Sequence, residues 1–191
     1  MRAGVLGLAL MAAWGTVMAT EEPSFEVVKA YEDFEVRLYD PYVIAETEVD
    51  GAFEKAGNAG FRVLFRYIDR GNARSESIAM TAPVTQSAKE GRTVVGFVMP
   101  AGSTLDTLPA PADARIRMRE VPSRRVAAIR YSGSWSEARF REHEAALRVA
   151  LEREGLRAAG EPIWARYNAP FVPWFLRRNE VLLEVAPEEA N

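Results

Sequence analysis

Hydrophobic and polar residues alternate along much of the chain, a pattern typical of strands that bury one face. This alternation predicts strands at residues 25–29, 35–39, 42–49, 77–85, 92–99, 115–121, 124–131, 163–171 and 180–185. Two other stretches place apolar residues at i, i+3 and i+4, which predicts helices over residues 51–69 and 136–154. Residues 100–114, rich in Pro, Ala and Gly, indicate a connector between two groups of elements.

The two groups follow the same order of strand, strand, helix, strand, strand, which indicates an internal repeat with halves at about 25–100 and 115–186. The matching segments are "EVDGAFEKA" (48–56) with "RYSGSWSEA" (130–138), and "MTAPV" (80–84) with "YNAPF" (167–171). Pro83 and Pro170 mark places where strand pairing must stop or bulge, because proline has no backbone N–H to donate. The predicted fold is therefore a single α+β domain, a distorted antiparallel β-barrel built from two ββαββ-like repeats and flanked by two helices.

Composition narrows the class of protein. Of the 191 residues, 24 are basic and 27 acidic, for a net charge of −3, and the basic residues are scattered. Without a basic tract we expect no nucleic-acid partner. The absence of Cys excludes disulfides, so the domain must be held by its core, and we expect a monomer.

The first residues indicate a targeting segment. Arg2, an apolar run at 5–13 and the small-x-small pattern Val17-Met18-Ala19 predict a secretory signal peptide over residues 1–19. We therefore expect an exported protein, periplasmic or secreted, with no stable membrane anchor after cleavage and residues 20–191 as its single domain. The alternative is an uncleaved anchor, because a segment of about 17 apolar residues can just span a bilayer.

Catalytic and metal motifs are not evident in the sequence. His143 is the single histidine, and in "HEAAL" Leu147 stands where the H-E-x-x-H zinc motif needs its second ligand. Phosphate-loop and dinucleotide motifs do not occur either. We therefore expect no enzyme activity. Two interpretations of His143 stay open: a buried, hydrogen-bonded residue on the face of the helix toward the sheet, or, less favoured, an axial ligand of a metal cofactor.

The predicted first helix carries more apolar surface than its packing needs. Beside the stripe that can pack on a sheet lie Phe61 and Phe65, and polar residues border that edge. An apolar shelf rimmed by cations suits an amphipathic, acid-bearing ligand, although a neighbouring loop could instead cover it. The residues of this predicted helix wall are Asn58, Phe61, Arg62, Phe65 and Arg66.

The segment "APFVPWFLRRNE" (169–180) is a candidate for the opposite wall. It has too many large aromatic residues for a plain solvated hairpin, so it either folds onto the core or forms a hydrophobic wall with arginines at the mouth. The candidate residues here are Phe171, Trp174, Arg177 and Arg178.

Four stretches, "VRLYDPYVIAET", "IAMTAPV", "YSGSWSEA" and "ARYNAPFVPWFLRRNEVLLEV", resemble the SOUL heme-binding protein family, from about Phe25 to Val185. The resemblance implies a distorted antiparallel barrel with heme or another tetrapyrrole as cofactor, held between the first helix and the loop joining the last two strands. Carried over by position, it implies Phe61, Arg66 and Arg178 as groove residues. Asn58 and Val172 stand where some members carry Arg and Lys. Iron ligation would be absent or would come from a Tyr or Met.

Two functions follow as hypotheses. The first is an exported heme- or tetrapyrrole-binding protein that holds its ligand in this apolar groove. The alternative is a general carrier or sensor of hydrophobic small molecules or lipids, which needs the same groove without a carboxylate-binding rim. A third, an enzyme acting on a hydrophobic substrate, has no acid–base pair to support it.

Overall fold

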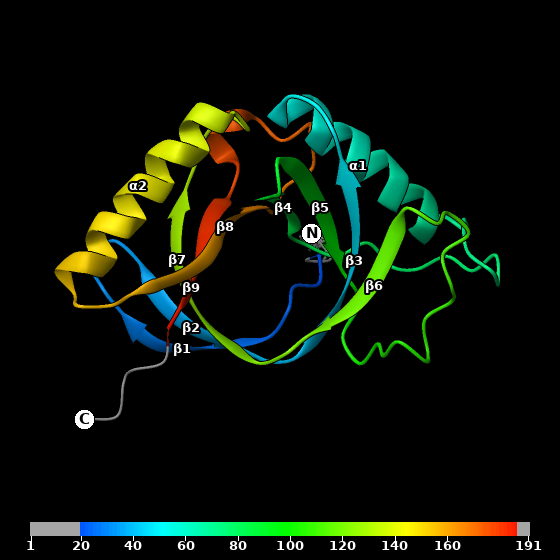
Figure 1. Cartoon of the computed structure of the whole chain (residues 1–191), viewed down its shortest axis with the longest axis horizontal. Helices are drawn as coiled ribbons and strands as arrows, with labels where there is room; N and C mark the ends of the chain where they lie inside the picture. The colour runs from blue at the N-terminus through cyan, green and yellow to red at the C-terminus, as the bar shows by residue number, and fades with distance from the viewer. Residues whose placement is uncertain (1–19, 187–191) are drawn as a thin grey trace, which may run out of the picture.

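The computed structural model describes residues 20–186 and consists of one curled antiparallel sheet with two helices on its outer, convex side (Figure 1). The predicted signal peptide lies outside the described residues. The strands are β1 (Phe25–Ala30), β2 (Glu35–Tyr39), β3 (Tyr42–Val49), β4 (Val84–Lys89), β5 (Arg92–Val98), β6 (Ile116–Val121), β7 (Arg124–Tyr131), β8 (Ala158–Arg166) and β9 (Asn179–Val185). The helices are α1 (Phe53–Ile68), α2 (Glu137–Arg153) and a short 3₁₀ helix, η1 (Trp174–Leu176).

The strand order is β1-β2-β7-β9-β8-β4-β5-β3-β6. β1 and β6 are the two edges of the sheet, which is therefore a half-barrel rather than a closed barrel. The predicted α+β class, an antiparallel curved sheet with two helices, is confirmed. Outward from the central β4–β8 pair, the strands follow as β5, β3, β6 on one side and β9, β7, β2 on the other. This order is compatible with two repeated halves, but the repeat itself stays a prediction.

Helix α1 packs closely on the sheet through small residues. Its buried stripe runs from Phe53 through Gly60 and Leu64 to Ile68, as the i, i+3, i+4 spacing predicts. A Cβ added at Gly60 would lie 2.5 Å from Val95 Cγ2 on β5. The glycine therefore allows the helix backbone to approach β5 more closely than any other residue would.

Helix α2 begins at a capping serine, because the Ser136 hydroxyl accepts a hydrogen bond from the Arg139 N–H at 3.4 Å. It ends before Gly155, which has a φ of +70° and can follow the helix without a steric penalty. No helix among residues 20–186 is long and apolar enough to cross a membrane.

Three apolar clusters form the core of the described part of the chain. One lies under α2 and includes Phe140 and Trp164, and a second lies under α1 and includes Leu64 and Phe97. A third, smaller cluster around Leu182 lies on the opposite face of the sheet. The helices therefore cover the convex face, and the concave face keeps less apolar packing.

Two predicted strands are wrong in their bounds, and proline is part of the reason in both. The strand predicted at 77–85 begins at Val84, directly after the cis Ala82–Pro83 bond, and runs on to Lys89. The strand predicted at 163–171 is β8, which ends at Arg166, well before Pro170. It also begins earlier, at Ala158, through an irregular stretch that has no alternating pattern to reveal it. Both prolines lie outside strand pairing, as expected for a residue without a backbone donor.

Candidate functional site

The two Ala-Pro segments meet at one place beside α1. In the antiparallel β4–β8 pair, Val84 lies opposite Arg166, so the chain entering β4 and the chain leaving β8 lie side by side. With α1 they enclose a groove of about 240 Å³. Its lining comes from Asn58, Phe61 and Phe65 of α1, from residues 80–82 and 84, from residues 166–170, and from Thr20 and Trp135.

The walls of this groove are mostly apolar. Phe61 and Phe65 lie nearly parallel, with ring centroids 5.9 Å apart, and Phe61 packs edge-on against Phe97 at 5.2 Å. Phe61 is half-buried, whereas Phe65 and Met80 are exposed. The two phenylalanines therefore form an open apolar shelf, and the neighbouring segments leave it uncovered.

Arg166 is the cation in this lining. Among residues 20–186, no carboxylate forms an ion pair with it. Burial lowers the pKa of the Arg166 guanidinium to about 10, and the nearby Tyr131 opposes that shift only in part. The side chain is still charged at pH 7, so the groove contains a desolvated positive charge that a ligand carboxylate could neutralise.

Trp135 holds two arginines at the edge of the groove. Its ring lies 4.2 Å from the Arg177 guanidinium and 5.2 Å from that of Arg166, and its Nε1 donates to Asn179 Oδ1 at 2.9 Å. The hydrogen bond fixes the indole, and the ring face stabilises both cations without neutralising them.

Behind the groove lies a buried network of charges. Glu180, which is completely buried, accepts hydrogen bonds from Arg37 at 2.7 Å, Tyr167 at 2.8 Å and Arg178 at 3.0 Å. Burial alone would raise the pKa of the Glu180 carboxyl, but these hydrogen bonds and charges hold it below its ordinary value. Arg178 also pairs with Glu22 at 2.9 Å, so its charge is already neutralised within the protein.

The structure brings some predicted residues together at the groove and leaves others outside it. Asn58, Phe61 and Phe65 line the groove. Arg62 is exposed, and Arg66 lines a separate hollow beside Asp113.

The predicted loop residues lie next to the groove rather than in its lining. Phe171 and Trp174 are exposed, and Arg177 donates to the carbonyls of Val172 and Pro170. Arg178 stacks on the Tyr167 ring at 3.7 Å. Their contribution to ligand binding stays a prediction.

His143 lies away from the groove. Its ring stacks on Tyr131, with centroids 3.8 Å apart, and its Nδ1 lies 2.8 Å from the Arg139 carbonyl oxygen. In residues 20–186, no three His, Asp or Glu side chains gather as a metal site requires.

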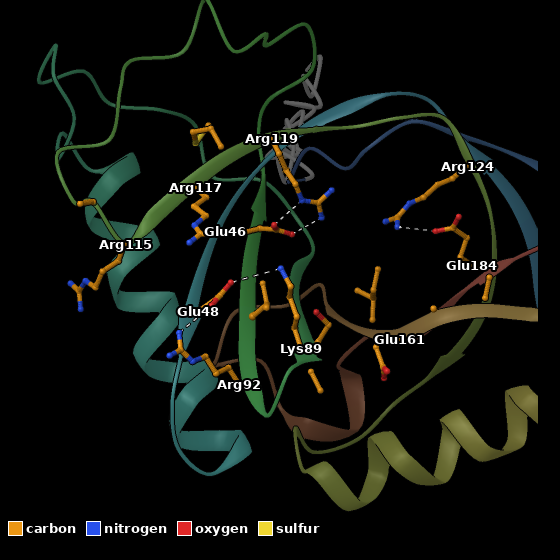
Figure 2. A pocket seen from close by; sticks show the side chains of 18 residues that line it. Glu46, Glu48, Lys89, Arg92, Arg115, Arg117, Arg119, Arg124, Glu161 and Glu184 are labelled. Atoms are coloured by element: carbon orange, nitrogen blue, oxygen red, sulfur yellow. Dashed lines mark hydrogen bonds and ion pairs between the residues drawn. The ribbon is translucent and has the colours of Figure 1, made fainter.

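A second, larger cavity of about 680 Å³ lies on the concave face of the sheet (Figure 2). Its charged side chains are largely paired with one another: Arg119 binds Glu46 through two hydrogen bonds of 2.7 and 2.8 Å, and Arg92 lies 3.3 Å from Glu48. The walls mix apolar side chains with these paired charges, so the cavity does not present the continuous aromatic surface of the groove beside α1.

Sequence reasoning missed Arg166, Met80 and Trp135 as groove residues. Met80 alternates with Ile78 and Ala82 as a core residue of a strand would, but all three lie before β4 rather than in it. Arg166 follows the buried Trp164 by two positions, so strand alternation places its charge on the buried face. A charged residue on the expected buried face of a strand is a signal in the sequence that marks Arg166 as unusual.

Comparisons with known proteins show the family of the chain. The family model for the SOUL heme-binding protein matches residues 20–184. Heme-binding protein 1 of Xenopus laevis is 29% identical over 156 residues, which are 78% of this chain and 81% of that protein.

Solved structures share the fold at low identity. The C-terminal domain of EcmrR superposes with a TM-score of 0.62 at 11% identity, over 80% of this chain and 96% of that one. SAV2435 bound to tetraphenylphosphonium superposes with a TM-score of 0.50 at 9% identity, over 81% and 94% of the two chains. The family match over residues 20–184 establishes that the chain belongs to the SOUL heme-binding protein family.

Proposed function

We propose that the protein binds heme or a related tetrapyrrole acid in the groove between α1 and the β8–β9 loop, as an exported binding protein without catalytic activity. The observation that carries the proposal is Arg166, a desolvated arginine without a carboxylate partner among residues 20–186, set among aromatic and thioether side chains. A ligand with a broad apolar surface and an acid group matches both features.

The size of the groove limits how such a ligand would fit. Its volume of about 240 Å³ lies below the range of about 300–1,000 Å³ usual for pockets that enclose drug-sized ligands. A ligand as large as a tetrapyrrole would therefore be partly enclosed. The open shelf of Phe61 and Phe65 would contact the apolar face, and Arg166 would bind a carboxylate.

Two side chains in the lining are of types that can bind heme iron. The Tyr167 hydroxyl donates to Glu180, and burial raises its pKa well above the ordinary value, so it stays protonated and is a poor ligand. Met80 is exposed and its thioether has no hydrogen-bonding role in the described structure. When bound, heme would supply the iron centre, and the protein would supply orientation and shielding from water.

A general carrier of hydrophobic molecules is the second candidate. It is supported by the predominantly apolar lining of the groove and by a fold neighbour that is bound to tetraphenylphosphonium, a hydrophobic cation. The positive charge of Arg166 opposes a cationic ligand, so the first candidate predicts a preference for acids, whereas a general carrier predicts no preference for ligand charge.

Titration of the purified protein with hemin tests the proposal, using the Soret band and the quenching of tryptophan fluorescence. The proposal predicts a saturable Soret shift at micromolar hemin and no comparable binding of tetraphenylphosphonium. The absence of any saturable shift would reject heme binding, and equal affinity for both compounds would favour the general carrier.

A further inference from the structure

The loop between β8 and β9 exposes an apolar tip. Within six consecutive residues, Phe171 is 88% exposed, Trp174 62%, Phe175 58% and Leu176 64%. Clusters of large apolar side chains on a soluble surface usually mark a contact with another molecule or with a membrane.

The loop that carries these exposed side chains is held by its own hydrogen bonds. Arg177 donates to the carbonyl of Val172 at 2.8 Å and to that of Pro170 at 2.7 Å. The Leu176 N–H donates to the Pro173 carbonyl at 2.9 Å, in the turn of η1. Because these backbone groups already have partners, moving the tip out of water costs less than it would for an open loop.

Positive charge lies on the helix that forms the other wall of the groove. Lys55, Arg62 and Arg66 are exposed, and none of them forms an ion pair within residues 20–186. At 100° per residue they fall within a narrow arc of α1, next to Phe65. Aromatic and leucine side chains combined with such cations are typical of segments that bind the interface of anionic bilayers.

We propose that the tip formed by Phe171, Trp174, Phe175 and Leu176 inserts into the interfacial layer of an anionic lipid bilayer. A bilayer fits better than a protein partner, because stable protein interfaces need about 20–30 residues a side and this patch is one loop tip. The base of the same loop, at Ala169 and Pro170, lines the groove. Docking would therefore bring the mouth of the groove close to the membrane, where amphipathic acids partition.

Sedimentation with sucrose-loaded vesicles tests this inference. Wild-type protein is mixed with vesicles of phosphatidylglycerol and phosphatidylcholine, and separately with phosphatidylcholine alone. We expect binding to the anionic vesicles, at least a tenfold loss in the Trp174→Ser/Phe175→Ser variant, and a salt-sensitive loss in Lys55→Gln/Arg62→Gln/Arg66→Gln. Val149→Ser is the matched control, because Val149 is an equally exposed apolar residue on α2 (64%), and it should bind as the wild type does.

Quenching of tryptophan fluorescence by brominated lipids tests the depth of Trp174 in the bilayer without requiring a variant that loses vesicle binding. Brominated lipids should quench the fluorescence of the wild type, and Trp174→Leu should keep vesicle binding but lose most of that quenching. The inference is overturned if the wild type does not sediment with anionic vesicles, or if the tip variant binds as well as Val149→Ser. It is also overturned if the tip instead mediates a concentration-dependent dimer in the absence of lipid. Hemin titration of Phe175→Ser/Leu176→Ser separates this outcome from the proposed function, because these two tip residues neither line the groove nor belong to its predicted walls, so the variant should lose vesicle binding and keep hemin binding.

Discussion

Arg166 places its guanidinium over the indole ring of Trp135, 5.2 Å from the ring centroid, at the end of the central strand β8. Arg166 is half-buried, and the aromatic ring compensates part of its desolvated charge, but no carboxylate among residues 20–186 pairs with it. A buried charge left in this state lowers the stability of the free protein and raises the affinity for a ligand that supplies the missing negative charge.

Replacing Arg166 by Met should separate stability from binding. Because the pKa of Arg166 is lowered to about 10 in the folded state, its positive charge opposes folding at neutral pH, and that cost is relieved as the pH rises through 10. Arg166→Met should therefore melt no lower than the wild type. A gain of 2–4 °C would correspond to roughly 1 kcal/mol for a domain of this size.

The same variant should bind hemin at least tenfold more weakly, from loss of one charge-assisted hydrogen bond. Arg62→Met is the matched control, since Arg62 is an exposed arginine of α1 outside the groove lining. The assignment of Arg166 would be wrong if both variants bound hemin equally, or if Arg62→Met alone weakened binding.

The two phenylalanines of the shelf should respond differently. Phe65 is exposed and Phe61 packs on Phe97. Phe65→Ser should weaken hemin binding several-fold with less than about 0.5 kcal/mol lost in the free energy of unfolding. Phe61→Ala should reduce both quantities. Chemical denaturation and hemin titration measure the two effects, and unchanged binding in both variants would place the ligand elsewhere.

Glu180 should govern the stability of the fold in acid. Its pKa is held below the ordinary 4.5, so its stabilisation is fully present above that pH and is lost as the pH falls through the lower folded-state value. Glu180→Ala should cost about 3–5 kcal/mol at pH 7, because it removes the buried partner of Arg37 and leaves that arginine with the more exposed Glu35 alone.

Urea denaturation between pH 3 and 7 measures this dependence. Glu184→Ala is the control on the same strand, since Glu184 is half exposed and lies 3.7 Å from Arg124, and it should cost less than about 1 kcal/mol. A Glu180→Ala loss no larger than that of the control would contradict the role of the buried network.

Gly60 should resist replacement although it lies within a helix. Alanine normally stabilises a helix interior by about 1 kcal/mol relative to glycine, but here its Cβ would lie 2.5 and 2.6 Å from two carbons of Val95. Gly60→Ala should therefore destabilise by about 1–3 kcal/mol. Adding Val95→Ala should relieve the clash, so that the double variant loses less than the sum of the single ones. A stabilised Gly60→Ala protein would show that α1 can move away from β5.

If hemin binds with an axial protein ligand, Met80 is the expected source. Met80→Ala should change the Soret position of the hemin complex, whereas His143→Ala should leave it unchanged, because His143 stacks on Tyr131 outside the groove. A spectral change in His143→Ala alone would reverse this assignment.

The sequence is sufficient to predict the class of fold, because the spacing of apolar residues that marks strands and helices is a local pattern. Both helices and most strands lie within two residues of their predicted bounds. The failures at residues 77–83 and 158–162 occur where the pattern is broken by Pro83 or by the irregular start of β8. Where the alternating pattern continues through a proline, it predicts a strand that cannot pair there. Where a bulge interrupts the alternation, it fails to predict a strand that is present.

The groove was only partly predictable. Asn58, Phe61 and Phe65 follow from the excess apolar surface of one helix. Strand alternation marks Arg166 as a charge on the buried face, but its meeting with Met80 could not be predicted without knowing that β4 pairs with β8, since this long-range contact brings the two Ala-Pro segments together. The aromatic residues 171–176 were recognised as unusual, but sequence alone could not show that they face solvent.

The central claim is that a carboxylate of the ligand pairs with Arg166. The most direct test compares protoporphyrin IX with its dimethyl ester, in wild-type protein and in Arg166→Met, by tryptophan quenching. We expect the wild type to bind the free acid at least tenfold more tightly than the ester, and this difference should largely disappear in the variant. Equal affinity of the wild type for the two compounds, or an undiminished difference in Arg166→Met, would contradict it.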